Sequence, residues 1–216
     1  PAPGPFSHEL ARQLANCNAA GIAIMRFEGA YEQLKQKAPV FNVGADWLAS
    51  LESVRYNRYA LRPKRMVDIV VTLLLMPIAL PLIGLSALLI WLLSGPPVFY
   101  SQTRVGKDGE PFTFTKLRTM VPNAERDTGP IWASEDDPRI TRIGRILRNM
   151  RLDELPQLFH VLAGQMSLVG PRPERPELIQ QLREEIPLYE QRLMVRPGIT
   201  GWAQIHHNYD RTTEDV

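Results

Sequence analysis

The longest uncharged stretch of the sequence constrains the fold most strongly. Residues 69–103 contain no Asp, Glu, Lys or Arg, and residues 69–93 are almost wholly apolar. A helix over this apolar part would be about 37 Å long, enough to cross a hydrocarbon core of about 30 Å. Length alone therefore favours a transmembrane helix.

Two features of this stretch argue against a simple crossing. Pro77 and Pro81 fall near its middle, where a proline removes a backbone donor and bends a helix. Basic residues also lie on both sides, whereas the positive-inside rule places them on the cytoplasmic side. They are Arg55, Arg58, Arg62, Lys64 and Arg65 before it, and Arg104, Lys107, Lys116 and Arg118 after it. A re-entrant hairpin over about residues 66–93 satisfies this pattern, with limbs of about 18–20 Å that are too short to span. Periodicity alone leaves both topologies open.

The first 55 residues read as a separate unit. Periodicity predicts a helix around Leu10 and Leu14, a short strand over residues 21–27 and a second helix over residues 28–37. We interpret residues 1–55 as the tail of a preceding α/β domain with a connector, and residues 56–216 as a second domain. The sequence starts at Pro1 and ends in a polar run, so we expect an excerpt of a longer protein.

Charge and cysteine content exclude several classes of protein. The formal net charge is +2, which gives no global case for nucleic-acid binding. The single Cys17 excludes an internal disulfide framework and a cysteine-based zinc cluster. His206 and His207 are adjacent rather than one helical turn apart, and this spacing argues against a metal site.

The pattern changes to that of strands after the apolar stretch. Residues 97–104 and 111–117 each read as a strand, and residues 107–110 between them have turn chemistry. We expect a hairpin near the membrane surface. Lys116 and Arg118 leave this hairpin as candidate phosphate ligands or as contacts with anionic lipid headgroups.

An arginine then recurs at every third position, with apolar residues between, which predicts an amphipathic helix. The arginines are Arg139, Arg142, Arg145, Arg148 and Arg151. A solvated or lipid-facing surface is the first interpretation for the first three. A nucleic-acid patch is disfavoured, because no aromatic residues are interleaved. Phosphate binding suits Arg148 best, since it lies nearest the following carboxylates and a guanidinium fork matches phosphate oxygens.

Two adjacent carboxylates, Asp153 and Glu154, open the next apolar-periodic segment. Leucines and a phenylalanine recur there at helical spacing, Pro156 is tolerated in a first turn, and Gly164 fits as a stop. An Asp before an apolar helix is commonly an N-cap. A reactive carboxylate preoriented at the helix N-terminus is the other interpretation, and the two are compatible.

Two later segments each present one arginine. Residues 167–173 hold Arg172 between two prolines, which fix the backbone on both sides of it. Residues 176–194 look helical. Arg196 opens a segment with two glycines and with Trp202, an indole of a size to cover a base or a sugar. Each segment by itself also fits an ordinary connecting loop.

Together these motifs resemble the bacterial sugar transferases that act on polyprenyl phosphate, the monotopic phosphoglycosyl transferases. The matching segments, in the family's order, are residues 64–68, 114–120, 152–158, 167–173 and 195–204. The first 55 residues resemble the large form of this family, in which a nucleotide-fold-like domain and further membrane helices precede the catalytic domain.

The resemblance implies an α+β, mainly helical fold with a re-entrant helix-break-helix segment, a short β-hairpin and amphipathic interfacial helices around the active site. Pro81 takes the place of the helix-breaking proline, Pro77 is an additional one, and Leu80 stands where the family often has Ser. Residues 56–216 would form the catalytic domain, on the cytoplasmic face of the bacterial inner membrane.

The resemblance also implies a reaction. Asp153 would attack the β-phosphate of a UDP-sugar, release UMP and form an aspartyl-phosphosugar intermediate, which undecaprenyl phosphate would then take up to start an exopolysaccharide or glycoconjugate. Glu154 would assist, and the two carboxylates would hold Mg²⁺. The implied phosphate and substrate ligands are Lys116, Arg118, Arg148, Arg172 and Arg196. The implied partners are UDP-sugar, polyprenyl phosphate and the bilayer, without nucleic acid; self-association is left open.

A protein of a different class is the alternative. A membrane-anchored scaffold or regulator of polysaccharide assembly would have a spanning helix and a catalytically silent domain. The two hypotheses differ in the side of the membrane on which residues 60 and 105 lie, and in the effect of Asp153→Asn.

Overall fold

The computed structural model describes residues 8–25, 29–31, 34, 58–124, 137–186 and 188–206, and the contacts divide the chain into two compact units, Pro1–Arg55 and Tyr56–Val216. In the first unit α1 spans His8–Ala19, as periodicity predicts. Residues 22–25 have no regular structure, so the predicted strand is wrong for its described part. Residues 29–31 and 34 are helical, and the rest of the second predicted helix lies outside the described residues.

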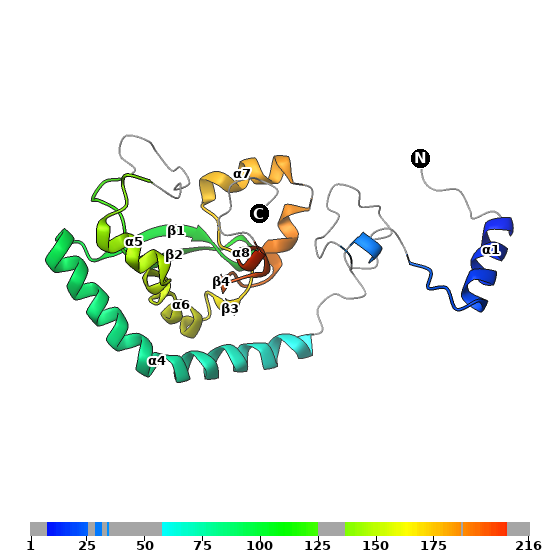
Figure 1. Cartoon of the computed structure of the whole chain (residues 1–216), viewed down its shortest axis with the longest axis horizontal. Coiled ribbons are helices and arrows are strands. Elements are labelled where there is room, and N and C mark those ends of the chain that lie inside the picture. The colour runs from blue at the N-terminus through cyan, green and yellow to red at the C-terminus, as the bar shows by residue number, and fades with distance from the viewer. Residues whose placement is uncertain are drawn as a thin grey trace. The chain divides into compact units, whose positions relative to one another are not determined.

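The second unit begins with one long helix, α4 (Arg58–Ser94), which contains Pro63, Pro77 and Pro81. Figure 1 shows that α4 bends along its length. The helical conformation continues through Pro77 and Pro81, so the chain is helical where the sequence predicts a break. Within the described residues, Arg62–Ser94 is the one segment long and apolar enough to cross a membrane.

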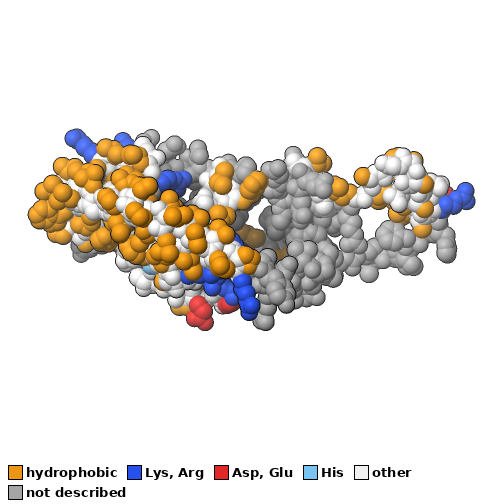
Figure 2. Space-filling view, turned by 90° about the horizontal axis from the view of Figure 1, so that it is seen from below, with side chains coloured by type: hydrophobic (Ala, Val, Ile, Leu, Met, Phe, Trp, Pro, Cys, Tyr) orange, Lys and Arg blue, Asp and Glu red, His pale blue; other side chains and the backbone are white. Residues whose placement is uncertain are grey.

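One side of α4 packs on the rest of the second unit, and its other side is exposed. Ile90 is fully buried in a cluster with Leu117, Ile143 and Leu147. Exposed apolar side chains recur along the helix, among them Val70, Leu74, Ile78, Leu85, Leu88 and Leu92. Figure 2 shows apolar side chains covering most of this face of the second unit. A helix at the surface of a soluble protein has an apolar stripe towards the core and a polar outer face, whereas the outer face of α4 is apolar.

A β-hairpin follows α4, as predicted. Strands β1 (Phe99–Val105) and β2 (Pro111–Leu117) pair antiparallel, with Phe99 opposite Leu117, and the short 3₁₀ turn η1 (Lys107–Gly109) joins them. The alternating Phe112 and Phe114 are buried in a second core cluster with Val161 and Met166. The mainly helical α+β class is therefore confirmed.

The amphipathic helix α5 (Arg142–Asn149) is shorter than the arginine spacing predicts. It begins after Thr141, which has an extended backbone and whose side chain accepts a hydrogen bond from the Gly144 amide. This N-cap sets the start of the helix. Arg139 lies outside the helix and pairs with Asp137 at 2.5 Å. Arg151 lies beyond the other end with φ 57°. A continuous helix from Arg139 to Arg151 is wrong.

The segment after α5 is the 3₁₀ turn η2 (Leu152–Glu154) followed directly by α6 (Gln157–Ala163), which ends at Gly164 with φ 86°, as predicted. The helix predicted over residues 176–194 is divided at Leu188, with φ 64°, into α7 (Pro176–Glu185) and the 3₁₀ helix η3 (Tyr189–Met194). Short strands β3 (Ser167–Val169) and β4 (Gly198–Thr200) pair in parallel, and α8 (Trp202–His206) follows β4. The sequence pattern predicts neither strand of this parallel pair.

Candidate active site

The acidic pair lies in η2, between α5 and α6. Asp153 is buried, with 5% of its surface exposed, and Glu154 is half-buried. The N-cap of α6 is Pro156, and no side chain makes a capping hydrogen bond there. The capping interpretation of Asp153 is therefore wrong for α6, and the burial of its carboxylate needs another explanation.

Burial is the main reason why the pKa of Asp153 is raised to about 6, and the neighbouring carboxylate of Glu154 raises it further. The charges of Lys116 and Arg148 act in the opposite direction. At neutral pH Asp153 is then an ionised but poorly solvated carboxylate with cations close by. Such a group is more reactive than a hydrated surface carboxylate.

Lys116 approaches the acidic pair from β2. Its ammonium nitrogen lies 5.7 Å from the centroid of the Tyr100 ring. Burial lowers the pKa of Lys116 to about 8; Asp153 opposes this shift, while the charges of Arg148, Arg172 and Arg104 add to it. The positive charges of this cluster therefore act on one another as well as on the acidic pair.

Two arginines from different segments complete the cluster. Arg148, on α5, donates from Nε to Oγ1 of Thr119 at 2.9 Å. Arg172, in the loop after β3, places Nη1 3.9 Å from Oε1 of Glu154. Arg151 also approaches Glu154, at 3.4 Å. The structure thus brings Lys116, Arg148 and Arg172 to the carboxylates, as the sequence predicts.

The other two predicted phosphate ligands, Arg118 and Arg196, donate hydrogen bonds to carbonyls at the C-terminal ends of helices instead. Nη2 of Arg118 donates to the carbonyls of Ser94 and Gly95, at 2.7 and 2.6 Å, where α4 ends. Nε of Arg196 donates to the Gly164 carbonyl at 2.8 Å, at the end of α6 remote from the acidic pair. Helix C-termini leave carbonyls unpaired and attract cations, which explains both positions. The structure does not gather these two arginines with the carboxylates.

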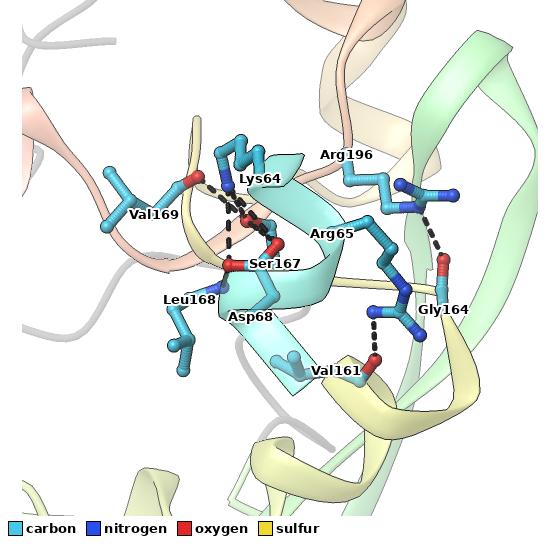
Figure 3. Close-up of polar contacts among 9 residues, drawn as sticks. All are labelled: Lys64, Arg65, Asp68, Val161, Gly164, Ser167, Leu168, Val169 and Arg196. Carbon is cyan, nitrogen blue, oxygen red and sulfur yellow. Dashed lines mark hydrogen bonds and ion pairs between the residues drawn. The ribbon is translucent and has the colours of Figure 1, made fainter. Parts of the chain in front are cut away.

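A second polar cluster, which sequence reasoning did not single out as a site, anchors α4 (Figure 3). The buried Asp68 accepts hydrogen bonds from Ser167 Oγ at 2.8 Å and from the Leu168 amide at 3.3 Å, and Lys64 pairs with it. Lys64 also contacts Ser167 Oγ. The sequence does place Lys64 and Asp68 four residues apart, a spacing that favours an ion pair on one face of a helix.

Arg65, from the same turn of α4, donates to the carbonyls of Val161 and Leu162, at 2.6 and 3.0 Å. Arg65 and Arg196 therefore meet the same end of α6 from two different elements (Figure 3). This part of α4 is held against α6 and β3, the elements that follow the acidic pair in the chain.

The acidic pair suits Mg²⁺ only in the company of a substrate. Among the residues that the structure describes, no three His, Cys, Asp or Glu side chains gather as a metal-binding group. Mg²⁺ commonly takes one or two carboxylates and completes its octahedral shell with water and phosphate oxygens. Asp153 and Glu154 supply that number of carboxylates.

Comparison with known proteins gives a consistent result. A family model described as bacterial sugar transferase matches residues 59–216. The chain is 39% identical over 208 residues (96% of this chain, 48% of the relative) to the UDP-N-acetylgalactosamine-undecaprenyl-phosphate N-acetylgalactosaminephosphotransferase of Aeromonas hydrophila. It is 47% identical over 144 residues (66% of this chain, 53% of the relative) to the UDP-glucose:undecaprenyl-phosphate glucose-1-phosphate transferase of Caulobacter vibrioides (strain ATCC 19089 / CIP 103742 / CB 15).

The protein of the same name in Escherichia coli (strain K12) is 45% identical over 143 residues, which cover 66% of this chain and 31% of that protein. The chain thus spans about half the length of the Aeromonas and Caulobacter relatives and about a third of the E. coli one.

Proposed function

This chain belongs to the bacterial sugar transferase family, and we propose that it transfers a sugar 1-phosphate from a UDP-sugar to undecaprenyl phosphate, with release of UMP. The observation that carries the proposal is the cluster at η2, where the buried carboxylate of Asp153, with a raised pKa, lies near Lys116 and Arg148, and the adjacent Glu154 lies beside Arg172. The relatives of this chain are named as transferases of glucose 1-phosphate or of N-acetylgalactosamine phosphate. Because the relatives differ in the sugar that they transfer, we propose the class of donor, a UDP-sugar, and not one sugar. The product would be the first lipid-linked unit of an exopolysaccharide or glycoconjugate.

In the first step, a carboxylate oxygen of Asp153 attacks the β-phosphorus of the UDP-sugar. A bond forms between that oxygen and phosphorus, and the bond from phosphorus to the bridging oxygen breaks, so that UMP leaves with the electron pair. Repulsion between a carboxylate and a diphosphate opposes this attack. Lys116, Arg148 and Arg172 offset it, because the first two lie near Asp153 and the third lies beside Glu154.

In the second step, a phosphate oxygen of undecaprenyl phosphate attacks the same phosphorus. The bond from phosphorus to Asp153 breaks, the carboxylate is regenerated and undecaprenyl diphosphate-sugar leaves. A covalent intermediate divides one difficult transfer into two easier displacements. It also lets a water-soluble donor and a lipid acceptor use the site in turn.

We propose Mg²⁺ as the cofactor, which Asp153 and Glu154 would hold when the donor is bound. When bound, the ion supplies positive charge that stabilises the charge building up on the leaving oxygen. Arg151 and Arg172 lie 3.4 and 3.9 Å from the Glu154 carboxylate and orient it.

We further propose that α4 is re-entrant, so that both of its ends lie on the cytoplasmic face of the inner membrane. Contacts at both ends support this topology. Arg65 and Asp68 tie the N-terminal part of α4 to α6 and β3, and Arg118 ties its C-terminal end to the exit of β2. If α4 crossed the bilayer, its two ends would lie on opposite sides of the hydrocarbon core. The second unit could not then make polar contacts with both ends.

UMP release from a panel of UDP-sugars, with Mg²⁺ and undecaprenyl phosphate, tests the reaction in the full-length protein. We expect release with one donor, loss of release in Asp153→Asn, and a covalent phosphosugar adduct in the wild-type protein when the acceptor is left out. Asp108→Asn, which changes an exposed carboxylate in η1, is the matched control and should keep its activity. Equal release by Asp153→Asn would exclude this residue as nucleophile. No release with any donor, from folded full-length protein, would favour the scaffold.

Cysteine accessibility tests the topology. Single cysteines near residues 60 and 105, in place of the exposed Arg62 and Lys107 on either side of the apolar segment, should both react with a membrane-impermeant reagent added from the cytoplasmic side to a protein with no other cysteine. Reaction of the two positions from opposite sides would show a spanning helix.

A further inference from the structure

The loop that carries Arg172 is held by its backbone carbonyls. Each of four successive carbonyls, from Pro171 to Glu174, accepts a hydrogen bond from another part of the second unit. The donors, in order along the loop, are the Gly198 amide at 2.8 Å, Arg192 Nη2 at 3.1 Å, Arg104 Nη1 at 2.8 Å and the Val105 amide at 2.9 Å.

The composition of the loop explains why carbonyls perform this role. Pro171 and Pro173 have no N–H group, so the segment cannot form a regular ladder with a neighbouring strand. Its fixed polar groups are largely acceptors, and two of the four donors are guanidinium groups. Hydrogen bonds from charged donors are stronger than those between neutral groups.

Arg192 binds the backbone of the residue whose side chain faces the acidic pair. Its Nη2 donates to the Arg172 carbonyl, while Nη1 of Arg172 lies 3.9 Å from Glu154. The guanidinium of Arg192 also lies 5.1 Å from the centroid of the Tyr189 ring, and Tyr189 is buried. A buried aromatic platform therefore limits the movement of Arg192.

Arg104 binds the next residue in the same way. Its Nη1 donates to the Pro173 carbonyl and lies 3.6 Å from Oε2 of the buried Glu174. Its guanidinium stands 5.6 Å from the centroid of the Phe114 ring. Because Phe114 belongs to β2, two residues before Lys116, Arg104 connects the Arg172 loop to the strand that carries the active-site lysine.

We propose that Arg104 and Arg192 are positioning residues for the transfer reaction. They act through the backbone of the loop and keep the guanidinium of Arg172 where the donor's diphosphate arrives. This inference rests on the proposed function, in which Arg172 binds phosphate.

A double-mutant cycle on the full-length protein tests the inference. We expect Arg192→Ala to raise the KM for the UDP-sugar about tenfold, the effect of losing one charged hydrogen bond, with a smaller change in kcat. Arg192→Lys keeps a cationic donor and should recover most of this loss. In an Arg172→Ala background, Arg192→Ala should change KM by less than about twofold, because the group that it positions is gone.

The matched control is Arg183→Ala. Arg183 forms an exposed 2.5 Å ion pair with Glu190 at the start of η3, so its loss disturbs the same helix without touching the loop. Its KM should stay within about twofold of the wild-type value. Additive effects of Arg192→Ala and Arg172→Ala, or an equal effect of Arg183→Ala, would overturn the inference.

Amide hydrogen exchange provides a readout that does not need turnover. In Arg192→Ala, the amides of Arg172 and Glu174 should exchange faster than in Arg183→Ala, because the loop is released. Unchanged exchange would overturn the positioning role even if the enzyme is active. Faster exchange in a protein that releases no UMP would leave the loop contact established and the proposed function refuted.

Discussion

Arg148 and Thr119 are joined by a 2.9 Å hydrogen bond from Nε to Oγ1, which links α5 to the segment that leaves the hairpin. Thr119 is buried and fixed on its other side as well: its carbonyl accepts hydrogen bonds from the amide of Thr141, at 2.9 Å, and from the Thr141 hydroxyl. The guanidinium that approaches Asp153 therefore has a defined position before any substrate binds. Preorganised charge of this kind costs no rearrangement at the moment of reaction.

Replacement of the Thr119 hydroxyl should weaken catalysis. Thr119→Val keeps the shape of the side chain but leaves Arg148 Nε without this acceptor, so we expect kcat/KM for the UDP-sugar to fall about tenfold. Thr119→Ser should stay within about twofold of wild type. Steady-state UMP release measures both, and Thr113→Val, at an exposed position of β2, is the control. Equal activities of the Val and Ser variants would contradict the proposed role of the hydroxyl.

Gly144 should tolerate no side chain. A Cβ atom at this position of α5 would lie 2.0 Å from the Thr119 carbonyl oxygen and 2.7 Å from its carbon. Because backbone rather than a flexible side chain is in the way, Gly144→Ala should lower the free energy of unfolding by about 2–3 kcal/mol. Gly84→Ala is the control, since nothing lies within 4 Å of that position. Thermal unfolding in detergent compares the two, and equal melting temperatures would contradict the predicted clash.

The pH dependence of kcat/KM should have two limbs. Asp153 attacks as a carboxylate, and burial raises its pKa to about 6, so activity should rise with pH through about 6. Lys116 binds phosphate as a cation, and burial lowers its pKa to about 8, so activity should fall as pH rises through about 8. Lys116→Arg should shift the alkaline limb upward, because a guanidinium keeps its proton there. A profile that is flat between pH 5 and 7 would contradict the raised pKa of Asp153.

Loss of the Asp68 carboxylate should loosen α4 from the second unit. Asp68→Ala removes the acceptor for Ser167 and Leu168 and leaves Lys64 without its partner, at a cost of about 2–3 kcal/mol in the free energy of unfolding. Asp108→Asn weakens an exposed pair with Lys107 and keeps a residue type that tolerates the φ of 57° at this position, so it should cost less than about 0.5 kcal/mol. Thermal unfolding of the full-length protein distinguishes the two, and equal costs would contradict the anchoring role of Asp68.

Several elements could be predicted from local sequence because local physics determines them. The hairpin follows from alternating Phe112 and Phe114 and from the Lys-Asp-Gly turn, and α6 follows from its apolar spacing and from Gly164. The start of α5 also has a local signal in Thr141, a preferred N-cap residue. The regular spacing of arginines led to a prediction that is too long, because Arg139 and Arg151 continue the pattern beyond both ends of the helix.

The sequence by itself determined which residue types this protein offers for chemistry: an adjacent Asp153 and Glu154, and a set of cations in motifs typical of the bacterial sugar transferases. The tertiary structure alone decided where each cation lies. Arg148 and Arg172 reach the carboxylates, whereas Arg118 and Arg196, with the same guanidinium, pair with the carbonyls that end α4 and α6. A helix end and an acidic pair attract an arginine through the same electrostatic force. Which of them an arginine meets depends on packing between segments distant in the chain, such as the β3–β4 pair, and neither periodicity nor motif spacing contains that information.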